Sequence, residues 1–123
     1  MMQVIVRETG RVLTEEGNTA YRFWPRFKGL MLQKQVRALH LQPCKRVHTW
    51  FMRVPIDVVY LDKDLRITGV EASLAPYRLG AAFPGTTSVL ELSEGSLEAM
   101  QLDPGQHLLL EERAPLSMSS HHV

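Results

Sequence analysis

Short apolar runs bounded by turn residues recur along the chain and predict a domain built mostly from strands. Residues 56–61 form a nearly continuous apolar run, which favours a strand buried at the centre of a sheet. A tight turn at 62–64 follows, and the alternation over 65–72 predicts the antiparallel partner of that strand. The other expected strands cover 2–7, 11–14, 38–41, 45–52, 89–92 and 107–111.

In two segments the apolar residues recur at helical spacing, and in one segment they follow no regular spacing. Residues 21–34 predict a longer helix, because their apolar side chains recur at helical spacing, and residues 96–102 predict a short one. The apolar positions of the longer helix are Phe23, Phe27, Leu30 and Met31. Turn residues break the chain at 16–18, and 75–87 hold two prolines and two glycines, which predicts a long irregular loop. Loops of that length in a small domain often cover a functional site.

These elements together predict an α+β fold that is mostly antiparallel β, with one longer and one short helix. A partly closed barrel is the expected arrangement of the strands. A chain of 123 residues fits one domain. We expect residues 1–112 to form it, and residues 113–123 to be a frayed polar tail.

Charge is distributed unevenly, although the net charge is only +1. Residues 1–61 hold ten Lys/Arg and four Asp/Glu, a balance of +6, whereas residues 62–123 hold four and nine, a balance of −5. Such asymmetry indicates either a basic face for an anionic partner or two halves that neutralise each other across a sheet. We favour the second reading, because the basic residues are spread out along the chain.

The cysteine count and the apolar runs predict the compartment. Cys44 is the only cysteine, so an internal disulfide is impossible. The first residues lack the long apolar stretch of a secretory signal, and no apolar run approaches the roughly 18 residues of a membrane-spanning helix. We therefore expect a cytoplasmic protein with no membrane partner.

Three segments in order carry a family resemblance. They are 26–31, which reads RFKGLM, 47–62, which reads VHTWFMRVPIDVVYLD, and 89–95, which reads VLELSEG. Their order and spacing resemble the conserved-hypothetical family called domain of unknown function 192, over roughly residues 20–111. The resemblance implies a small mostly-β fold with a helix carrying the Gly-Leu-Met segment, and it implies no established activity. The chain departs from many relatives in a shorter stretch before Pro55 and in Gln106, where they often have Asp.

Four charged residues within or beside apolar segments are candidates for a binding pocket. Asp57 and Glu91 lie in strands that appear buried, Arg26 lies on the longer helix, and Arg53 precedes the Pro55 bend. Because an unpaired buried charge is expensive, we expect them to be paired. One reading is two ion pairs that fix the helix against the sheet, and the residues alone favour it. The other reading is an anion-binding pocket in which an arginine grips a carboxylate or phosphate.

His48 is the candidate for catalysis. A histidine with an ordinary pKa near neutrality suits a general base, which would activate Thr49 or Cys44 as the nucleophile. Cys44 precedes His48 by four residues, so in a strand the two side chains would share a face. One cysteine and one histidine form a weak signature, and a satisfied, partly buried histidine is the commoner outcome.

Metal and nucleic-acid chemistry are alternatives that the pattern does not favour. The spacing of Cys44, His48, His40 and Asp57 matches no closed tetrahedral site, so we expect no metal and no cofactor. Residues 21–28 interleave cations and aromatics, as single-strand nucleic-acid binders do. The same aromatic side chains fit the apolar face of the longer helix, where they could not stack on bases.

The sequence therefore predicts a small noncatalytic binding or accessory domain that holds a small anion or a peptide segment under the 75–87 loop. The candidate pocket consists of Arg26, His48, Thr49, Arg53, Asp57 and Glu91. A hydrolase or transferase that uses His48 with Thr49 or Cys44 is one alternative. A nucleic-acid-associated module that uses the basic N-terminal half is the other.

Overall fold

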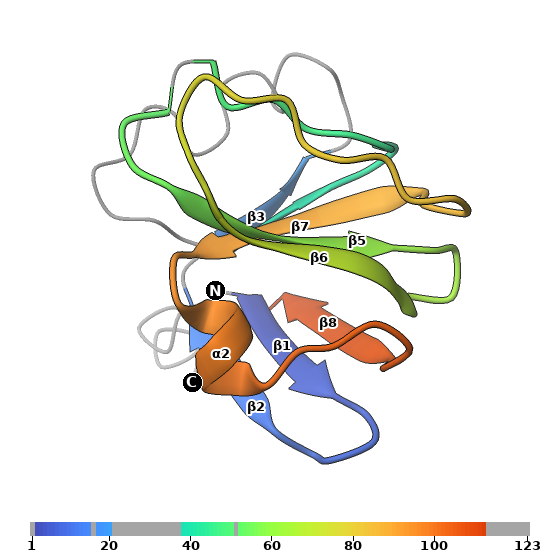
Figure 1. Ribbon diagram of the computed structural model, residues 1–123. Coiled ribbons are helices and arrows are strands. Elements are labelled where there is room, and N and C mark those ends of the chain that lie inside the picture. Colours follow the sequence, from blue (N-terminus) through green and yellow to red (C-terminus); the bar gives the residue numbers. More distant parts are fainter. Residues whose placement is uncertain (1, 16, 21–37, 51, 113–123) are drawn as a thin grey trace, which may run out of the picture.

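The computed structural model describes residues 2–15, 17–20, 38–50 and 52–112, which form two β-sheets and one short helix (Figure 1). The elements are β1 (Met2–Val6), β2 (Val12–Glu15), β3 (Gly17–Ala20), β4 (Ala38–Leu41), β5 (Ile56–Leu61), β6 (Ile67–Leu74), β7 (Ser88–Ser93), α2 (Ser96–Met100) and β8 (Leu108–Glu112). The three-stranded sheet has the order β2-β1-β8, and the five-stranded sheet has the order β3-β4-β7-β5-β6. The pair β3-β4 is parallel, and the other pairs are antiparallel.

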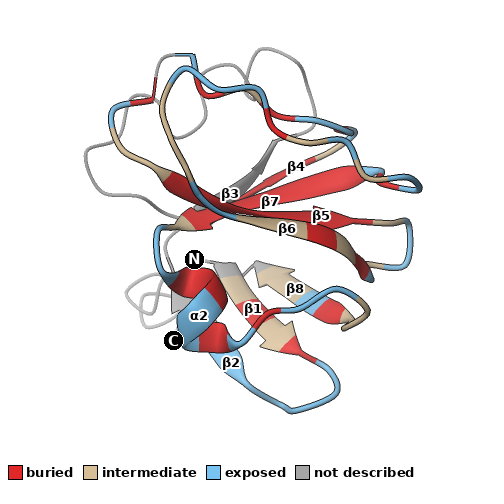
Figure 2. Cartoon of the chain, viewed as in Figure 1, coloured by how far each residue is buried: buried red, intermediate tan, exposed pale blue. Residues whose placement is uncertain are grey.

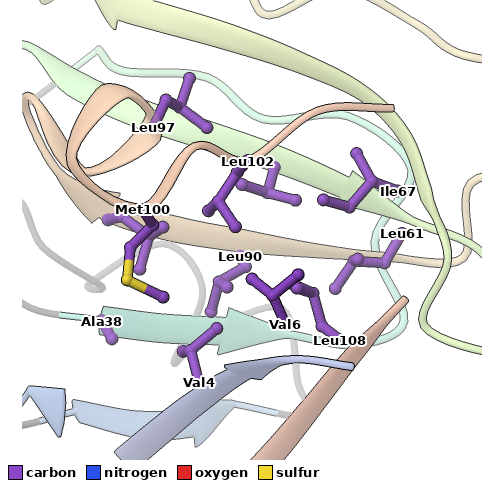
Figure 3. Close-up of a cluster of buried hydrophobic side chains, with 12 residues drawn as sticks. Val4, Val6, Ala38, Leu61, Ile67, Leu90, Leu97, Met100, Leu102 and Leu108 are labelled. Carbon is purple, nitrogen blue, oxygen red and sulfur yellow. The ribbon is translucent and has the colours of Figure 1, made fainter. Parts of the chain in front are cut away.

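The five-stranded sheet is covered on both of its faces (Figure 2). All six residues of β5 are buried, as are the first five of β7. Because side chains alternate along a strand, neighbouring residues of β5 enter two different cores. On one face Leu61 joins Val4 of β1 and Leu97 of α2 in one cluster (Figure 3). On the other face Val58 belongs to a second cluster with Val47, from the irregular chain before β5.

Several predictions from the sequence are confirmed by these elements. The strands at Ala38–Leu41 and Ile56–Leu61 have the expected bounds. β6 pairs antiparallel with β5, as the turn at 62–64 indicated, and residues 75–87 contain no named helix or strand. The broad class, α+β with mostly antiparallel strands, is confirmed too.

Two local predictions are wrong. Among the described residues of 45–52 there is no strand, and only His48 makes a bridge, with Leu79. The Met52 N–H donates to the Thr49 carbonyl at 3.2 Å and turns the chain, which ends the pleat that the apolar pattern had indicated. The break expected at 16–18 does not include Gly17 and Asn18, since β3 begins at Gly17 and pairs with β4. This pairing overrides the poor intrinsic strand propensity of glycine and asparagine.

The two sheets do not close into a barrel within the described residues. They share one hydrophobic core, and their chains are bridged at one corner, where Arg66 pairs with His107. Glu8 reinforces this corner, because its carboxylate accepts the His107 N–H at 2.9 Å and lies 2.7 Å from His107 Nδ1. The side-chain hydrogen bond to His107, followed by the one to its main chain, lowers the pKa of Glu8 to about 2.

The longer helix expected at 21–34 and the tail expected at 113–123 fall outside the described residues.

No helix in the described ranges has both the length and the apolar character that crossing a bilayer requires.

His40 is a buried polar residue in β4, with 6% of its surface exposed. It pairs with Leu90 of β7 and therefore faces the core shared with the three-stranded sheet. Its Nε2 atom has no hydrogen-bond partner among the described residues. Burial lowers the pKa of His40 below its ordinary 6.5, because the charged ring is poorly solvated there.

We predict that His40 makes the fold less stable in mild acid. The unfolded chain takes up a proton on this ring as the pH falls through 6.5, while the folded chain resists it, so stability falls from that pH downward until the lowered folded-state pKa is reached. Urea unfolding from about pH 8 to about pH 5 should show this decline. His40→Leu should flatten it, and parallel profiles for the two proteins would contradict the assignment.

Candidate functional site

An irregular cap covers the face of the five-stranded sheet that lies away from α2 (Figure 1). It consists of residues 42–50, 52–55 and 75–87, which connect β4 to β5 and β6 to β7. Cys44, Val47 and Met52 point inward and form an apolar cluster with the strands below. The cap therefore has a buried underside, and its remaining side chains are available for an outer surface.

Thr49 joins the two segments of the cap. Its side chain is 1% exposed. Its hydroxyl accepts the Arg78 N–H at 2.8 Å and lies 2.7 Å from the Ala75 carbonyl oxygen, to which it donates. Its main chain accepts the Tyr77 N–H at 2.7 Å and donates to the Arg78 carbonyl at 2.9 Å. One buried residue thus fixes residues 75–78 against residues 47–50.

Gly80 is a second joint, where the cap comes close to the sheet. A side chain at this position would collide with the Tyr60 hydroxyl and would lie 2.8 Å from Val47 Cγ2. The Tyr60 hydroxyl donates to the Glu71 carboxylate at 2.5 Å, and the same carboxylate accepts the Ala81 N–H at 2.8 Å. Burial is the main cause that raises the pKa of Tyr60, and the Glu71 carboxylate raises it further. The phenol therefore stays protonated and acts as the donor. The absence of a Cβ is what lets the cap reach this hydrogen bond.

The outer surface of the cap is basic. Its charged side chains are Lys45, Arg46, Arg53 and Arg78, and all four residues are exposed. Residues 42–55 and 72–87 contain no Asp or Glu at all, so no carboxylate within them neutralises these cations. The Arg46 Nε donates to the Gly80 carbonyl at 2.5 Å, which holds one guanidinium beside the cap's second segment.

Large apolar side chains are exposed on the same cap. Trp50 is 44% exposed, Tyr77 is 65% exposed and Leu79 is 53% exposed. The rings of His48 and Trp50 stack with their centroids 6.0 Å apart and an angle of 27° between their planes. His48 also pairs directly with Leu79 across the bridge. Exposed aromatic side chains next to arginines are the composition found at the centres of binding surfaces.

Asp57 lies on the opposite face of the sheet from the cap. It pairs with Leu92 of β7, which belongs to the core below the sheet. Its carboxylate accepts the Gly95 N–H at 3.0 Å, the Leu97 N–H at 2.9 Å and the Ser73 N–H at 2.9 Å. The first two bonds satisfy main-chain donors at the start of α2, where Gly95 offers no side-chain cap. Asp57 is therefore placed to hold α2 on the sheet.

Glu91 lies on the cap side of the sheet and is 6% exposed. It pairs with Leu39 of β4 on one side and with Val58 of β5 on the other, and both belong to the cluster beneath the cap. Of the six candidate pocket residues, the structure brings His48, Thr49 and Arg53 into the cap and places Glu91 beneath it. Asp57 is separated from them by the sheet, and Arg26 lies outside the described residues.

The two candidate nucleophiles are both engaged inside the cap. Thr49 gives its hydroxyl hydrogen to a main-chain carbonyl, as described above. The Cys44 thiol donates to the Arg46 carbonyl at 3.1 Å, and Cys44 is 3% exposed. A nucleophile needs an accessible atom next to its base, so this arrangement gives the proposed pairing with His48 no support. Among the described residues, no three His, Cys, Asp or Glu side chains gather closely enough to hold a metal ion.

Open grooves on the described surface lie away from the candidate pocket. One runs along the cap's edge, lined by Lys45 and residues 82–87. A second lies between residues 84–85 and the turn at Pro104, and a third lies beside α2 at Arg11 and Gln101. None of these three grooves is lined by any of the six candidate residues.

A family model decides the relationship of this chain to known proteins. The model of domain of unknown function 192, described as "Uncharacterized ACR, COG1430", matches residues 4–110. The chain belongs to the domain of unknown function 192 family. The resemblance carried by the three sequence segments is thereby confirmed. No curated protein matches the chain.

Solved structures share the fold of this family member. A crystal structure of a protein of unknown function from Novosphingobium aromaticivorans matches with a TM-score of 0.74 at 20% identity, over 88% of this chain and 82% of the other. A crystal structure of a "putative transcription regulator" from Sinorhizobium meliloti also has a TM-score of 0.74, at 19% identity, over 88% of this chain and 90% of the other. At these identities the likeness establishes the fold alone.

Sequence reasoning missed several residues that build the cap of this domain of unknown function 192 protein. They are Arg46, Trp50, Tyr60, Glu71, Tyr77, Arg78, Leu79 and Gly80. One signal was visible in the sequence, because residues 17–56 contain eight Lys/Arg and no Asp or Glu. The contact of Gly80 with Tyr60 had no sequence signal, because the two residues come together only when the cap folds over the sheet.

We predict that Thr49→Val loosens the cap. Valine keeps the shape of threonine but leaves the Arg78 N–H without its side-chain acceptor, which should reduce the free energy of unfolding by about 1–3 kcal/mol. Amide exchange at Tyr77, Arg78 and Gly80 should speed up more than exchange in β5. Thr87→Val, at an exposed position, is the control and should be nearly neutral. Equal exchange in the two variants would contradict the role given to Thr49.

We predict that Asp57→Ala destabilises the whole domain. The substitution leaves three main-chain donors without their acceptor, one of them the buried Leu97 N–H, at a cost of about 2–4 kcal/mol. Chemical denaturation measures the change. Asp64→Ala, at an exposed turn position, is the control, and its stability should stay within about 0.5 kcal/mol of wild type. Similar losses in both variants would show that the carboxylate does not hold α2.

Proposed function

We propose that the protein is a small noncatalytic binding domain whose cap holds an anionic ligand, either a small anion or a peptide segment. The observation that carries this proposal is the charge of the cap, whose segments hold four exposed cations and no Asp or Glu. The carboxylate that reaches the cap from β6, that of Glu71, is engaged by Tyr60 and Ala81. A surface of one sign attracts ligands of the other sign. Arginine, which supplies three of the four cations, binds carboxylates and phosphates through two parallel hydrogen bonds.

Rigidity of the cap supports the same proposal. The hydrogen bonds of Thr49 and the contact at Gly80 fix both segments before any ligand arrives. A surface that is already ordered loses less conformational entropy on binding, which favours affinity. The binding surface in this proposal comprises His48 and Arg53 of the predicted set, and buried Thr49 acts through the main chain that it positions. A cytoplasmic location is part of the proposal, since the single cysteine calls for no oxidising compartment.

Single-stranded nucleic acid is a second candidate ligand of the same surface. Trp50 and Tyr77 expose aromatic rings on the arginine-bearing cap, and the run 17–56 carries eight cations without an acid. Stacking on aromatic rings together with phosphate contact is the way such strands are bound. The Sinorhizobium meliloti protein that shares this fold is described as a "putative transcription regulator", and this description is what that comparison adds to the nucleic-acid candidate.

We predict that the cap arginines determine anion binding. Fluorescence anisotropy with labelled polyglutamate at low ionic strength should detect binding that weakens as salt is added. Arg53→Gln combined with Arg78→Gln should weaken it roughly 2- to 30-fold, because each exposed charge contributes about 0.2–1 kcal/mol. Arg11→Gln combined with Arg66→Gln removes two exposed arginines outside the cap and is the matched control. Equal weakening in both double variants would mean that net charge, and not the cap, is responsible.

A further inference from the structure

Leu79 lies on an unpaired edge of the cap. It faces His48 in an antiparallel bridge, and the hydrogen bonds on either side are made by its neighbours, from the Thr49 N–H to Arg78 and from the Gly80 N–H to Val47. In a pair of this kind the N–H and C=O of the residue itself point away from its partner. No described residue bonds to either group of Leu79, which is 53% exposed. The cap thus presents a donor and an acceptor in strand geometry.

The surroundings of this edge combine positive charge with apolar surface. Arg78 precedes Leu79 in the chain, and Arg46 bonds the Gly80 carbonyl on the side of the 47–50 segment, behind this edge. The apolar surface consists of the stacked rings of His48 and Trp50 and of the Leu79 side chain, because Leu79 is the bridge partner of His48. A ligand that fills this edge must therefore offer main-chain-like hydrogen bonds, negative charge and apolar side chains together.

We infer that the ligand of the cap is an acidic, extended peptide segment of a partner protein, which adds to the Leu79 edge as a short strand. This inference rests on the proposed function and names its ligand class. The peptide's main chain pairs with the N–H and C=O of Leu79, as in other cases of strand addition. Its carboxylates meet Arg78, and its apolar side chains, which alternate with the acidic ones along a strand, meet Leu79 and Trp50.

A peptide fits these groups better than a nucleic acid does. Pairing with the Leu79 edge needs an acceptor and a donor on the same side of an extended chain, at the spacing of peptide groups. A phosphodiester backbone carries acceptors only and cannot return a hydrogen bond to the Leu79 carbonyl. The composition of the surface, with tryptophan, tyrosine and arginine but no carboxylate, is that of protein interfaces at their centres.

Three labelled probes of equal charge test the inference on the full chain. They are a peptide of alternating Glu and Val, polyglutamate, and an oligothymidylate. We expect the alternating peptide to bind about tenfold more tightly than polyglutamate. Both main chains can pair with Leu79, but only the alternating peptide offers apolar side chains and the strand preference of valine. Its binding should also slow hydrogen exchange at the Leu79 amide, to which no residue in the described ranges is bonded. Exchange at the Gly80 amide should change less, since that group is already bonded to Val47.

The possible outcomes separate this inference from the proposed function. If polyglutamate binds as well as the alternating peptide and the Leu79 amide is not protected, the cap is an anion site and the strand-addition inference is wrong. If the oligothymidylate binds most tightly, the partner class is nucleic acid and the inference is likewise overturned. If no probe binds, both the inference and the proposed function fail.

Two variants with matched controls locate the contact. Arg78→Gln and Trp50→Ala should each weaken binding of the alternating peptide several-fold, whereas Arg66→Gln and Leu109→Ala should not. Arg66 is an exposed arginine outside the cap, and Leu109 is a 46% exposed side chain on β8. Because both altered cap residues are exposed, the variants should fold normally, and unchanged melting temperatures verify this. Undiminished binding by both cap variants would place the peptide elsewhere and contradict the inference.

Discussion

The burial of the five-stranded sheet on both faces is the constraint on which the rest of this structure depends. Along β5 and β7, alternate side chains enter two different cores, one shared with α2 and β1 and one shared with the cap. A polar residue in either strand must therefore find its partner within one layer. Asp57 finds main-chain donors below the sheet, and Glu91 lies above it. Because side chains alternate along these strands, the position of a charged residue decides whether it lies in the core with α2 or faces the cap.

The same constraint explains how much of the fold could be predicted from the sequence. The strand at 56–61 was recognisable because a strand buried on both faces has an almost uninterrupted apolar run. The described residues of 45–52 instead turn at Thr49, where the Met52 N–H bonds to the Thr49 carbonyl, and periodicity could not reveal this turn. Strand order was beyond sequence reasoning too, because β7 inserts between β4 and β5 although it follows both in the chain.

The candidate site was predicted in part for a related reason. Selecting charged residues in apolar segments pointed to Arg53, and the catalytic hypothesis added His48 and Thr49. The same selection of charges included Asp57, whose side chain is on the far face. The method favours buried charges, whereas the binding that we propose for the cap rests on exposed residues such as Trp50, Tyr77 and Arg78. Exposed residues have no periodicity to reveal them, and they become a surface only when Thr49 and Gly80 join the two segments.

The central claim of this account is that the cap, and not the opposite layer of the molecule, is the binding surface for anions. Mapping amide chemical shifts in a two-dimensional NMR titration with polyglutamate tests it most directly. The account predicts that the shifts concentrate in residues 45–53 and 77–80 and at the Trp50 indole, while Gly95 and Leu97 beside Asp57 stay unchanged. Shifts centred on α2 and β1, or none at a concentration where anisotropy reports binding, would contradict it.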